Sequence, residues 1–139
     1  MGLHSYTITL LGEPIAKKRP RFNIKTGRVY DCQYKESKSV KMMILSELIK
    51  HSKITPIKNA VSLNISFYKE PPKSISKKKR SQLIGTPDLR KPDLDNYLKF
   101  ILDCSNGIVF EDDRQVYKII SEKIYAEESK IEMEISVWK

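Results

Sequence analysis

Two short acidic stretches in this chain have the residue types and spacing of a divalent-metal site. Asp93 and Asp95 are separated by one residue, and Glu111, Asp112 and Asp113 are consecutive. Carboxylate oxygens, together with water, are the ligands that Mg²⁺ and Mn²⁺ prefer. Two carboxylates about 4 Å apart repel each other by about 4 kcal/mol at an effective dielectric constant of roughly 20. If the fold brings the two stretches together, this repulsion favours a cation between them.

The same residues would suit phosphodiester hydrolysis. A bound cation activates a coordinated water, orients the scissile phosphate and neutralises developing charge. Lys99 follows Asp95 at a spacing that puts both on one helix face, where its ammonium could stabilise the transition state. Each feature also has a purely structural interpretation. Asp93 could be a helix N-cap, Asp95 with Lys99 an ion pair worth about 0.3–0.5 kcal/mol, and residues 111–113 a polar turn.

The charge of the chain is unevenly distributed. The 26 Lys and Arg residues and 17 Asp and Glu residues give a formal net charge of +9 at pH 7. Residues 1–90 carry +13 and residues 91–139 carry −4, which fits a polyanion-binding body with an acidic, cation-dependent site. A first basic cluster, in a loop with aromatic neighbours for base stacking, contains Lys17, Lys18, Arg19, Arg21 and Arg28. A second contains Lys77, Lys78, Lys79 and Arg80, and it could equally be a solvated helix start.

The composition excludes several classes of protein and site. With 40% hydrophobic and 31% charged residues, the chain is folded rather than disordered or fibrous. No apolar run approaches the roughly 18 residues that span a bilayer, and no signal peptide is visible. The two cysteines, Cys32 and Cys104, lack CxxC spacing, and two histidines offer no zincin motif or Ser-His-Asp triad. We therefore expect a cytoplasmic protein without membrane contact.

Hydrophobic periodicity predicts the elements that must position the acidic residues. Alternation with a period of two predicts strands over residues 5–10, 61–68 and 130–138, and a β-rich composition predicts another over 115–127. Helical spacing predicts helices over residues 34–52, 74–84 and 94–105. The last two strands are close enough in sequence to form a hairpin through Glu128 and Ser129.

This order of elements predicts a single α+β domain over residues 1–139. We expect a largely antiparallel mixed sheet with helices packed on one face. Asp93 would begin the helix at 94–105, which Asn106 and Gly107 would end. Residues 112 and 113 would then return toward the helix start.

Two blocks of the sequence resemble the RusA family of Holliday-junction resolvases, which are common in bacteria and their prophages. The first is GEPIAKKRPR at residues 12–21, followed by GRVY at 27–30. The second combines DLDN at 93–96, Lys99 and GIVFEDDRQV at 107–116. The resemblance implies a RusA-like, Mg²⁺-dependent crossover junction endodeoxyribonuclease of DNA recombination and repair.

The resemblance also implies a role for each matching residue. Asp93, Asp95 and Asp113 would be the essential carboxylates that bind Mg²⁺ or Mn²⁺, Lys99 the active-site lysine, and Asp112 a supporting acid. Contacts to the DNA backbone would come from Lys17, Lys18, Arg19 and Arg21. The implied enzyme is a nucleoid-associated homodimer, without a small-molecule cofactor, that nicks four-way DNA symmetrically. A two-fold pair of sites suits such a substrate.

Two other interpretations follow from the residues alone. A PD-(D/E)xK-type nuclease would use Asp93 with Glu128 and Lys130, and it predicts that Asp113 is dispensable. A non-catalytic basic DNA-binding protein would use its acidic residues only to cap a helix. It predicts that Asp93→Asn changes neither stability nor activity.

Overall fold

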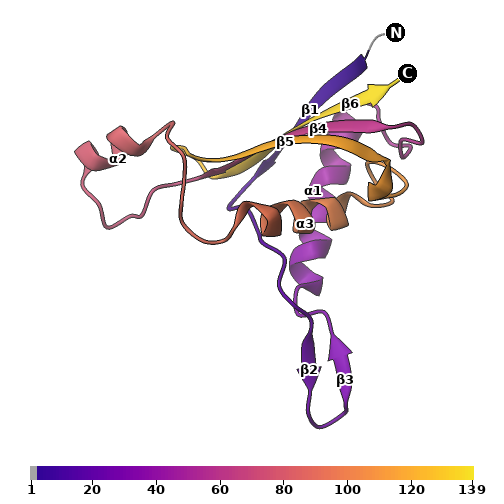
Figure 1. The fold of residues 1–139 in the computed structure, drawn as a ribbon, viewed down its shortest axis with the longest axis horizontal. Coiled ribbons are helices and arrows are strands. Elements are labelled where there is room, and N and C mark those ends of the chain that lie inside the picture. The colour runs from indigo at the N-terminus through magenta and orange to yellow at the C-terminus, as the bar shows by residue number, and fades with distance from the viewer. Residues whose placement is uncertain (1–2) are drawn as a thin grey trace.

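Four long strands and two long helices make up the body of the protein, in a computed structural model that describes residues 3–139 (Figure 1). The strands are β1 (Leu3–Leu11), β4 (Val61–Lys69), β5 (Val116–Tyr125) and β6 (Lys130–Trp138). The helices are α1 (Tyr34–Lys50), α2 (Lys77–Leu83) and α3 (Leu94–Ser105), with a short 3₁₀ helix η1 (Asp113–Gln115). A separate hairpin consists of β2 (Arg21–Asn23) and β3 (Arg28–Tyr30). The predicted α+β class and all three predicted helices are confirmed.

The main sheet has the strand order β1-β6-β4-β5. Strand β6 lies between β1 and β4 and is antiparallel to both, whereas β4 and β5 are parallel. Ile131, Met133 and Ile135 of β6 are buried in the alternating pattern that the sequence predicts for this strand. Most side chains of β5 are exposed or only partly buried, because β5 is an edge strand.

The expected hairpin between residues 115–127 and 130–138 is wrong. Strand β4 lies between β5 and β6, so these two strands are neighbours in sequence but not in the sheet. Their connection crosses the end of β4, where the Ala126 N–H donates to the Lys69 carbonyl oxygen at 3.1 Å. Strand β6 is therefore an interior strand, with β1 paired along one edge and β4 along the other.

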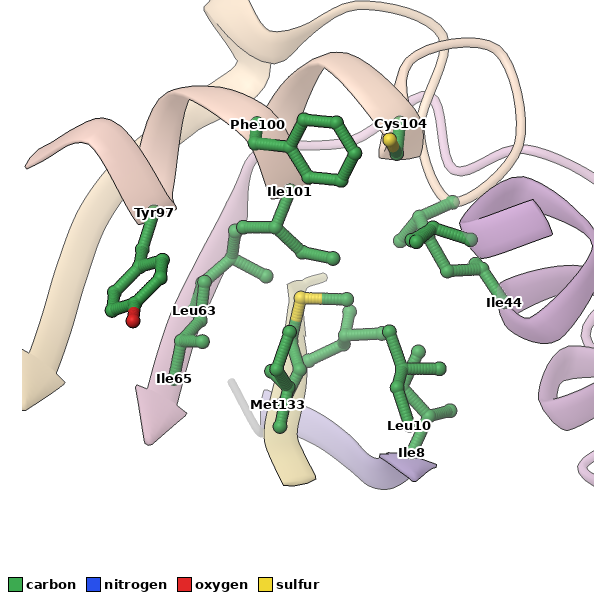
Figure 2. Packing of buried hydrophobic residues seen from close by; sticks show 14 of the residues in the cluster. Ile8, Leu10, Ile44, Leu63, Ile65, Tyr97, Phe100, Ile101, Cys104 and Met133 are labelled. Carbon is green, nitrogen blue, oxygen red and sulfur yellow. The ribbon is translucent and has the colours of Figure 1, made fainter. Parts of the chain in front are cut away.

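Helices α1 and α3 cover one face of the sheet (Figure 1). The hydrophobic core lies between this face of the sheet and the two helices (Figure 2). It contains side chains of the sheet and of both helices, including Ile8, Leu63, Met133, Ile44 and Ile101. The Tyr97 ring stacks on Phe67 of β4 with a centroid distance of 5.0 Å. This contact fixes the first turns of α3 on the sheet, and therefore the residues that precede it.

Two segments project from this body (Figure 1). One is the β2–β3 hairpin, in which Asn23 Oδ1 accepts a hydrogen bond from the Lys25 N–H and Gly27 adopts φ +67°. The sequence predicted a loop with a turn here, but not the two short strands. The other is α2, where Ser76 Oγ accepts from the Lys79 N–H at 3.2 Å as an N-cap. Within residues 3–139, no helix is long and apolar enough to cross a bilayer.

Candidate active site

The start of α3 presents Asp93, Asp95 and Lys99 to solvent. Asp93 occupies the N-cap position, as predicted, but its carboxylate makes no capping hydrogen bond. Lys99 Nζ lies 3.9 Å from Asp95 Oδ2, and these side chains are 65% and 68% exposed. An ion pair at that exposure contributes at most about 1 kcal/mol, so it explains little of the fold. This end of the helix therefore offers two carboxylates and an ammonium to a ligand.

Asp112 and Asp113 lie immediately before β5, in a turn that Gln115 holds in place. Gln115 Nε2 donates to the Ile57 carbonyl oxygen at 2.7 Å, and its Oε1 accepts from the Asp112 N–H at 2.8 Å. Asp112 Oδ2 is 3.4 Å from Arg114 Nε. Asp113 begins η1, and its side chain is partly exposed. The glutamine stands in the block that resembles the resolvases, but its anchoring role was not predicted.

Helix α3 separates the two acidic stretches. Asp93 lies at its N-terminal end, whereas Asn106 and Gly107 end the helix and lead toward η1. A helix of 12 residues is about 18 Å long, and η1 lies beyond the end opposite Asp93 (Figure 1). Among residues 3–139, no three His, Cys, Asp or Glu side chains are placed to share a metal ion. The expectation that one chain gathers Asp93, Asp95 and Asp113 is therefore wrong.

The segment after α3 does not return to the start of α3, because it is anchored beside the residues that precede β4. The Ile57 N–H donates to the Val109 carbonyl oxygen at 2.9 Å, and the Glu111 N–H donates to the Ile57 carbonyl oxygen at 3.2 Å. Val109 and Phe110 are buried, which adds apolar contact to these bonds. Strand β5 then runs back along the sheet, so its Lys123, rather than Asp113, reaches the start of α3.

Asp88, Arg90 and Lys123, which were not predicted, hold the chain that enters α3. Arg90 donates from Nε and Nη2 to the two carboxylate oxygens of Asp88, at 3.0 and 2.9 Å. Asp88 is only 4% exposed. Lys123 Nζ donates to the carbonyl oxygens of Arg90 and Pro92, the second at 2.6 Å. These contacts fix the backbone directly before Asp93.

The Asp88–Arg90 pair is ionised. Burial by itself would raise the pKa of Asp88, but hydrogen bonds from the side chain and backbone of Arg90 outweigh it and lower the pKa below its usual value. The same hydrogen bond raises the pKa of Arg90. At neutral pH Asp88 is therefore a carboxylate paired with the Arg90 guanidinium.

The basic segment, defined as residues 17–21, begins beside α3. The Lys17 N–H donates to the Asn96 carbonyl oxygen at 2.9 Å, and Lys17 Nζ lies 3.1 Å from Asp103 Oδ2. Hydrogen bonding to Asp103 raises the pKa of Lys17, so this side chain stays charged. Asn96 directly follows Asp95, so the structure brings the backbone of Lys17, the first residue of the predicted basic cluster, next to the start of α3, whereas its ammonium pairs with Asp103 near the end of the helix.

The other predicted DNA contacts lie on the two projections. Arg21 and Arg28 belong to the β2–β3 hairpin, where Phe22 is 61% and Tyr30 is 47% exposed. The exposed lysines of α2 are Lys77, Lys78 and Lys79. Arg80 differs from them, because its Nη1 donates to the Pro71 carbonyl oxygen at 3.3 Å. The hairpin thus combines basic and aromatic side chains, whereas α2 offers charge alone.

The alternative nuclease motif has no support from the structure. Lys130 Nζ lies 3.1 Å from Glu132 Oε1 and 5.5 Å from the centroid of the Tyr68 ring. These side chains lie on the sheet face opposite α3, because their neighbours Phe67 and Ile131 are buried beneath the helices. Lys130 therefore lies on the opposite face of the sheet from α3, the helix that Asp93 begins.

Comparison with known proteins matches nearly the whole chain. The sequence model of the family described as Endodeoxyribonuclease RusA matches residues 12–136. A protein of Bacillus subtilis (strain 168), described as "Uncharacterized protein YqaN", is 34% identical over 131 residues, which cover 91% of this chain and 92% of that protein. The family match includes the basic segment and both acidic stretches.

Proposed function

Because the chain belongs to the RusA family of endodeoxyribonucleases, which act on four-way DNA junctions, we propose that it resolves Holliday junctions by paired symmetric nicks in recombination and repair. The proposed enzyme is a homodimer that requires Mg²⁺, with Mn²⁺ as a substitute. The observation that supports it best is the state of Asp93. This residue occupies an N-cap position but caps nothing, so its carboxylate is available to a ligand.

The proposed metal ligands come from two chains. Asp93 and Asp95 supply oxygen ligands of the kind that Mg²⁺ prefers, but Asp113 of the same chain lies beyond the other end of α3. A two-fold dimer can bring Asp113 of a second copy to Asp93 and Asp95 of the first. Such a dimer has two equivalent sites, as symmetric cleavage of two strands requires.

Each residue of this site would have a distinct role. A bound cation lowers the pKa of a coordinated water and neutralises charge on the scissile phosphate. Lys99, whose exposed ammonium lies beside Asp95, would stabilise the additional negative charge on the phosphate in the transition state. Asp112 would support Asp113 by keeping the turn before β5 in place through its contacts with Gln115 and Arg114.

DNA would lie along the basic segment and the β2–β3 hairpin. Lys17 stands beside α3, so phosphates bound here would pass close to Asp95 and Lys99. A cavity of about 490 Å³ next to the basic segment is lined partly by Lys17, Lys38 and Lys41. The exposed aromatic rings of the hairpin can stack on unpaired bases, as aromatic side chains do in other proteins that bind single strands.

A synthetic four-way junction with labelled strands tests the proposal. The wild-type protein should nick two opposed strands symmetrically with Mg²⁺ and should not cleave after chelation. Asp93→Asn, Asp95→Asn and Asp113→Asn should each abolish cleavage while junction binding persists, because they remove negative charge that repels phosphate. Glu134→Gln, an exposed position on β6, is the matched control and should cleave normally. Cleavage that survives all three substitutions would dismiss the catalytic assignment.

A further inference from the structure

The β2–β3 hairpin carries three exposed apolar side chains close together. Phe22 of β2 lies directly opposite Val29 of β3, so both side chains stand on the same face of the hairpin. Ile24 follows Phe22 by two residues, at the tip. Phe22, Ile24 and Val29 are 61%, 89% and 68% exposed, and we call them the apolar ridge. Single exposed apolar residues are ordinary, but an apolar cluster on a projecting element marks a binding surface.

The opposite face of the hairpin is basic. Arg21, Arg28 and Tyr30 occupy the other pleat positions of the two strands, so their side chains lie on the side away from the ridge. Residues 17–30 contain six Lys or Arg residues and no Asp or Glu. A partner that matches the whole hairpin must therefore combine anionic groups with a flat apolar surface.

Hydrogen bonds hold the hairpin in shape at both ends. At the tip, Asn23 Oδ1 accepts from the Lys25 N–H at 2.9 Å, and the Gly27 N–H donates to the Asn23 carbonyl oxygen at 2.8 Å. At the base, the buried Gln33 side chain accepts from the Lys18 N–H at 2.8 Å. The ridge is therefore formed before any partner binds, which lowers the entropy lost on binding.

DNA offers the matching surface where its base stacking is interrupted. Within a duplex the faces of the bases are covered by their neighbours, whereas at a branch point the stacking of one arm ends. Proteins that separate bases insert apolar side chains such as Phe and Ile, and unstacking costs least where pairing is already disturbed. An anionic membrane also combines charge with an apolar interior, but the chain belongs to a family of DNA endonucleases, which favours DNA.

We propose that the apolar ridge inserts between unstacked bases at the branch point of a four-way junction, while Arg21 and Arg28 hold the phosphates beside it. The proposal rests on the proposed function, and it explains how the enzyme would distinguish branched from linear DNA. At the base of the hairpin, the Lys17 N–H donates to the Asn96 carbonyl oxygen of α3 at 2.9 Å. A ridge seated at the branch point would thus set the position of α3 on the DNA.

Fluorescence of a base analogue tests the insertion without cleavage. One synthetic four-way junction carries 2-aminopurine beside the branch point, and a second carries it in the middle of an arm. With EDTA present, saturating wild-type protein should raise the fluorescence several-fold at the branch point, because stacking quenches this base. The arm position should stay nearly unchanged. At saturation, Phe22→Ala and Ile24→Ala should each lose most of the rise.

Binding affinity separates insertion from a general phosphate contact. Phe22→Ala and Ile24→Ala should each lower the affinity for the junction by about fivefold or more, as lost base contacts do in other proteins. Affinity for a linear duplex with the sequence of one arm should change by less than about twofold, because the ridge has no open base step there. Ile24→Leu keeps an apolar tip and should bind like the wild type. Ile49→Ala, at an exposed position on α1, is the matched control.

The outcomes separate the inserted ridge from the enzymatic function. Wild-type protein that binds or cleaves the junction without a rise at the branch point would overturn the insertion alone, and so would a full rise in Ile24→Ala. Protein that does not bind the junction would also overturn it, and flotation with phosphatidylserine vesicles would then assign the ridge to a membrane. A rise that depends on Phe22 and Ile24, in a protein that does not cleave with Mg²⁺, would confirm the insertion and count against the proposed function alone.

Discussion

Lys123 Nζ donates a hydrogen bond to the Pro92 carbonyl oxygen at 2.6 Å, so a side chain of β5 fixes the peptide that precedes Asp93. Lys123 also lies 5.9 Å from the centroid of Tyr97, on the first turns of α3. Strand β5, the last strand of the sheet, thus sets the position of the first proposed metal ligand.

Lys123→Met should reduce the rate of junction cleavage and leave junction affinity nearly unchanged. The substitution removes both hydrogen bonds to the backbone before Asp93 but leaves the exposed basic surface intact. Loss of a group that orients metal ligands typically costs about 10- to 100-fold in activity or metal affinity. Single-turnover cleavage at several Mg²⁺ concentrations, beside a binding assay, measures both quantities. Lys58→Met, at an exposed position, is the control, and equal losses in the two variants would argue against a positioning role.

Asp88→Asn should lower the free energy of unfolding by about 1–3 kcal/mol at neutral pH, because it removes the buried carboxylate that accepts hydrogen bonds from the partly exposed Arg90 guanidinium. The folded-state pKa of Asp88 is lowered, so its stabilising contribution is present above the unfolded-state pKa near 3.8 and is lost as the pH falls through the folded-state value. The difference in unfolding free energy between variant and wild type should therefore be constant from about pH 5 to 8. It should become smaller as the pH falls below the unfolded-state pKa of Asp88. Urea unfolding across this range measures it.

The exposed Glu127→Gln variant provides the baseline for that comparison. It should match the wild-type protein at every pH. A gap between Asp88→Asn and wild type that stays unchanged under acid conditions would show that the carboxylate charge does not stabilise the fold.

Arg19→Gln/Arg21→Gln should weaken junction binding and flatten its salt dependence. Both side chains are exposed in or beside the β2–β3 hairpin. Each lost phosphate contact should reduce the slope of log affinity against log salt by about 0.9. Fluorescence anisotropy at several salt concentrations measures this slope. Lys50→Gln, at the far end of α1, should leave it unchanged, and an unaltered slope in the arginine variant would remove the hairpin from the interface.

Sequence reasoning located α3 and its boundaries because the determinants are local. Its apolar stripe, the aspartate before it and the Asn106-Gly107 stop all lie within or next to the helix. Pairing between segments that are distant in the chain leaves no such local signal in the sequence. The insertion of β4 between β5 and β6, and the anchoring of residues 109–111 at Ile57, depend on backbone bonds between distant parts of the chain.

The sequence indicated which residues make up the candidate site but not how the fold arranges them. The exposed carboxylates of α3 and the nearby basic segment follow from residue type and spacing. The role of Gln33 does not follow from residue type or spacing. This side chain is 1% exposed, accepts a hydrogen bond from the Lys18 N–H and donates one to the Ala16 carbonyl oxygen, and so holds the basic segment in place. The separation of Asp93 from Asp113 depends on the chain direction after α3, which tertiary contacts decide.

The most direct test of the two-chain site mixes two inactive variants. Asp93→Asn and Asp113→Asn dimers should not cleave alone, but after subunit exchange each mixed dimer has one site with intact Asp93, Asp95 and Asp113, so nicking should return. A mixture of Asp93→Asn with Asp95→Asn should stay inactive, because both residues come from the same chain. Co-purification of differently tagged subunits verifies exchange. If exchanged Asp93→Asn and Asp113→Asn subunits remain inactive together, the site is not shared between two chains.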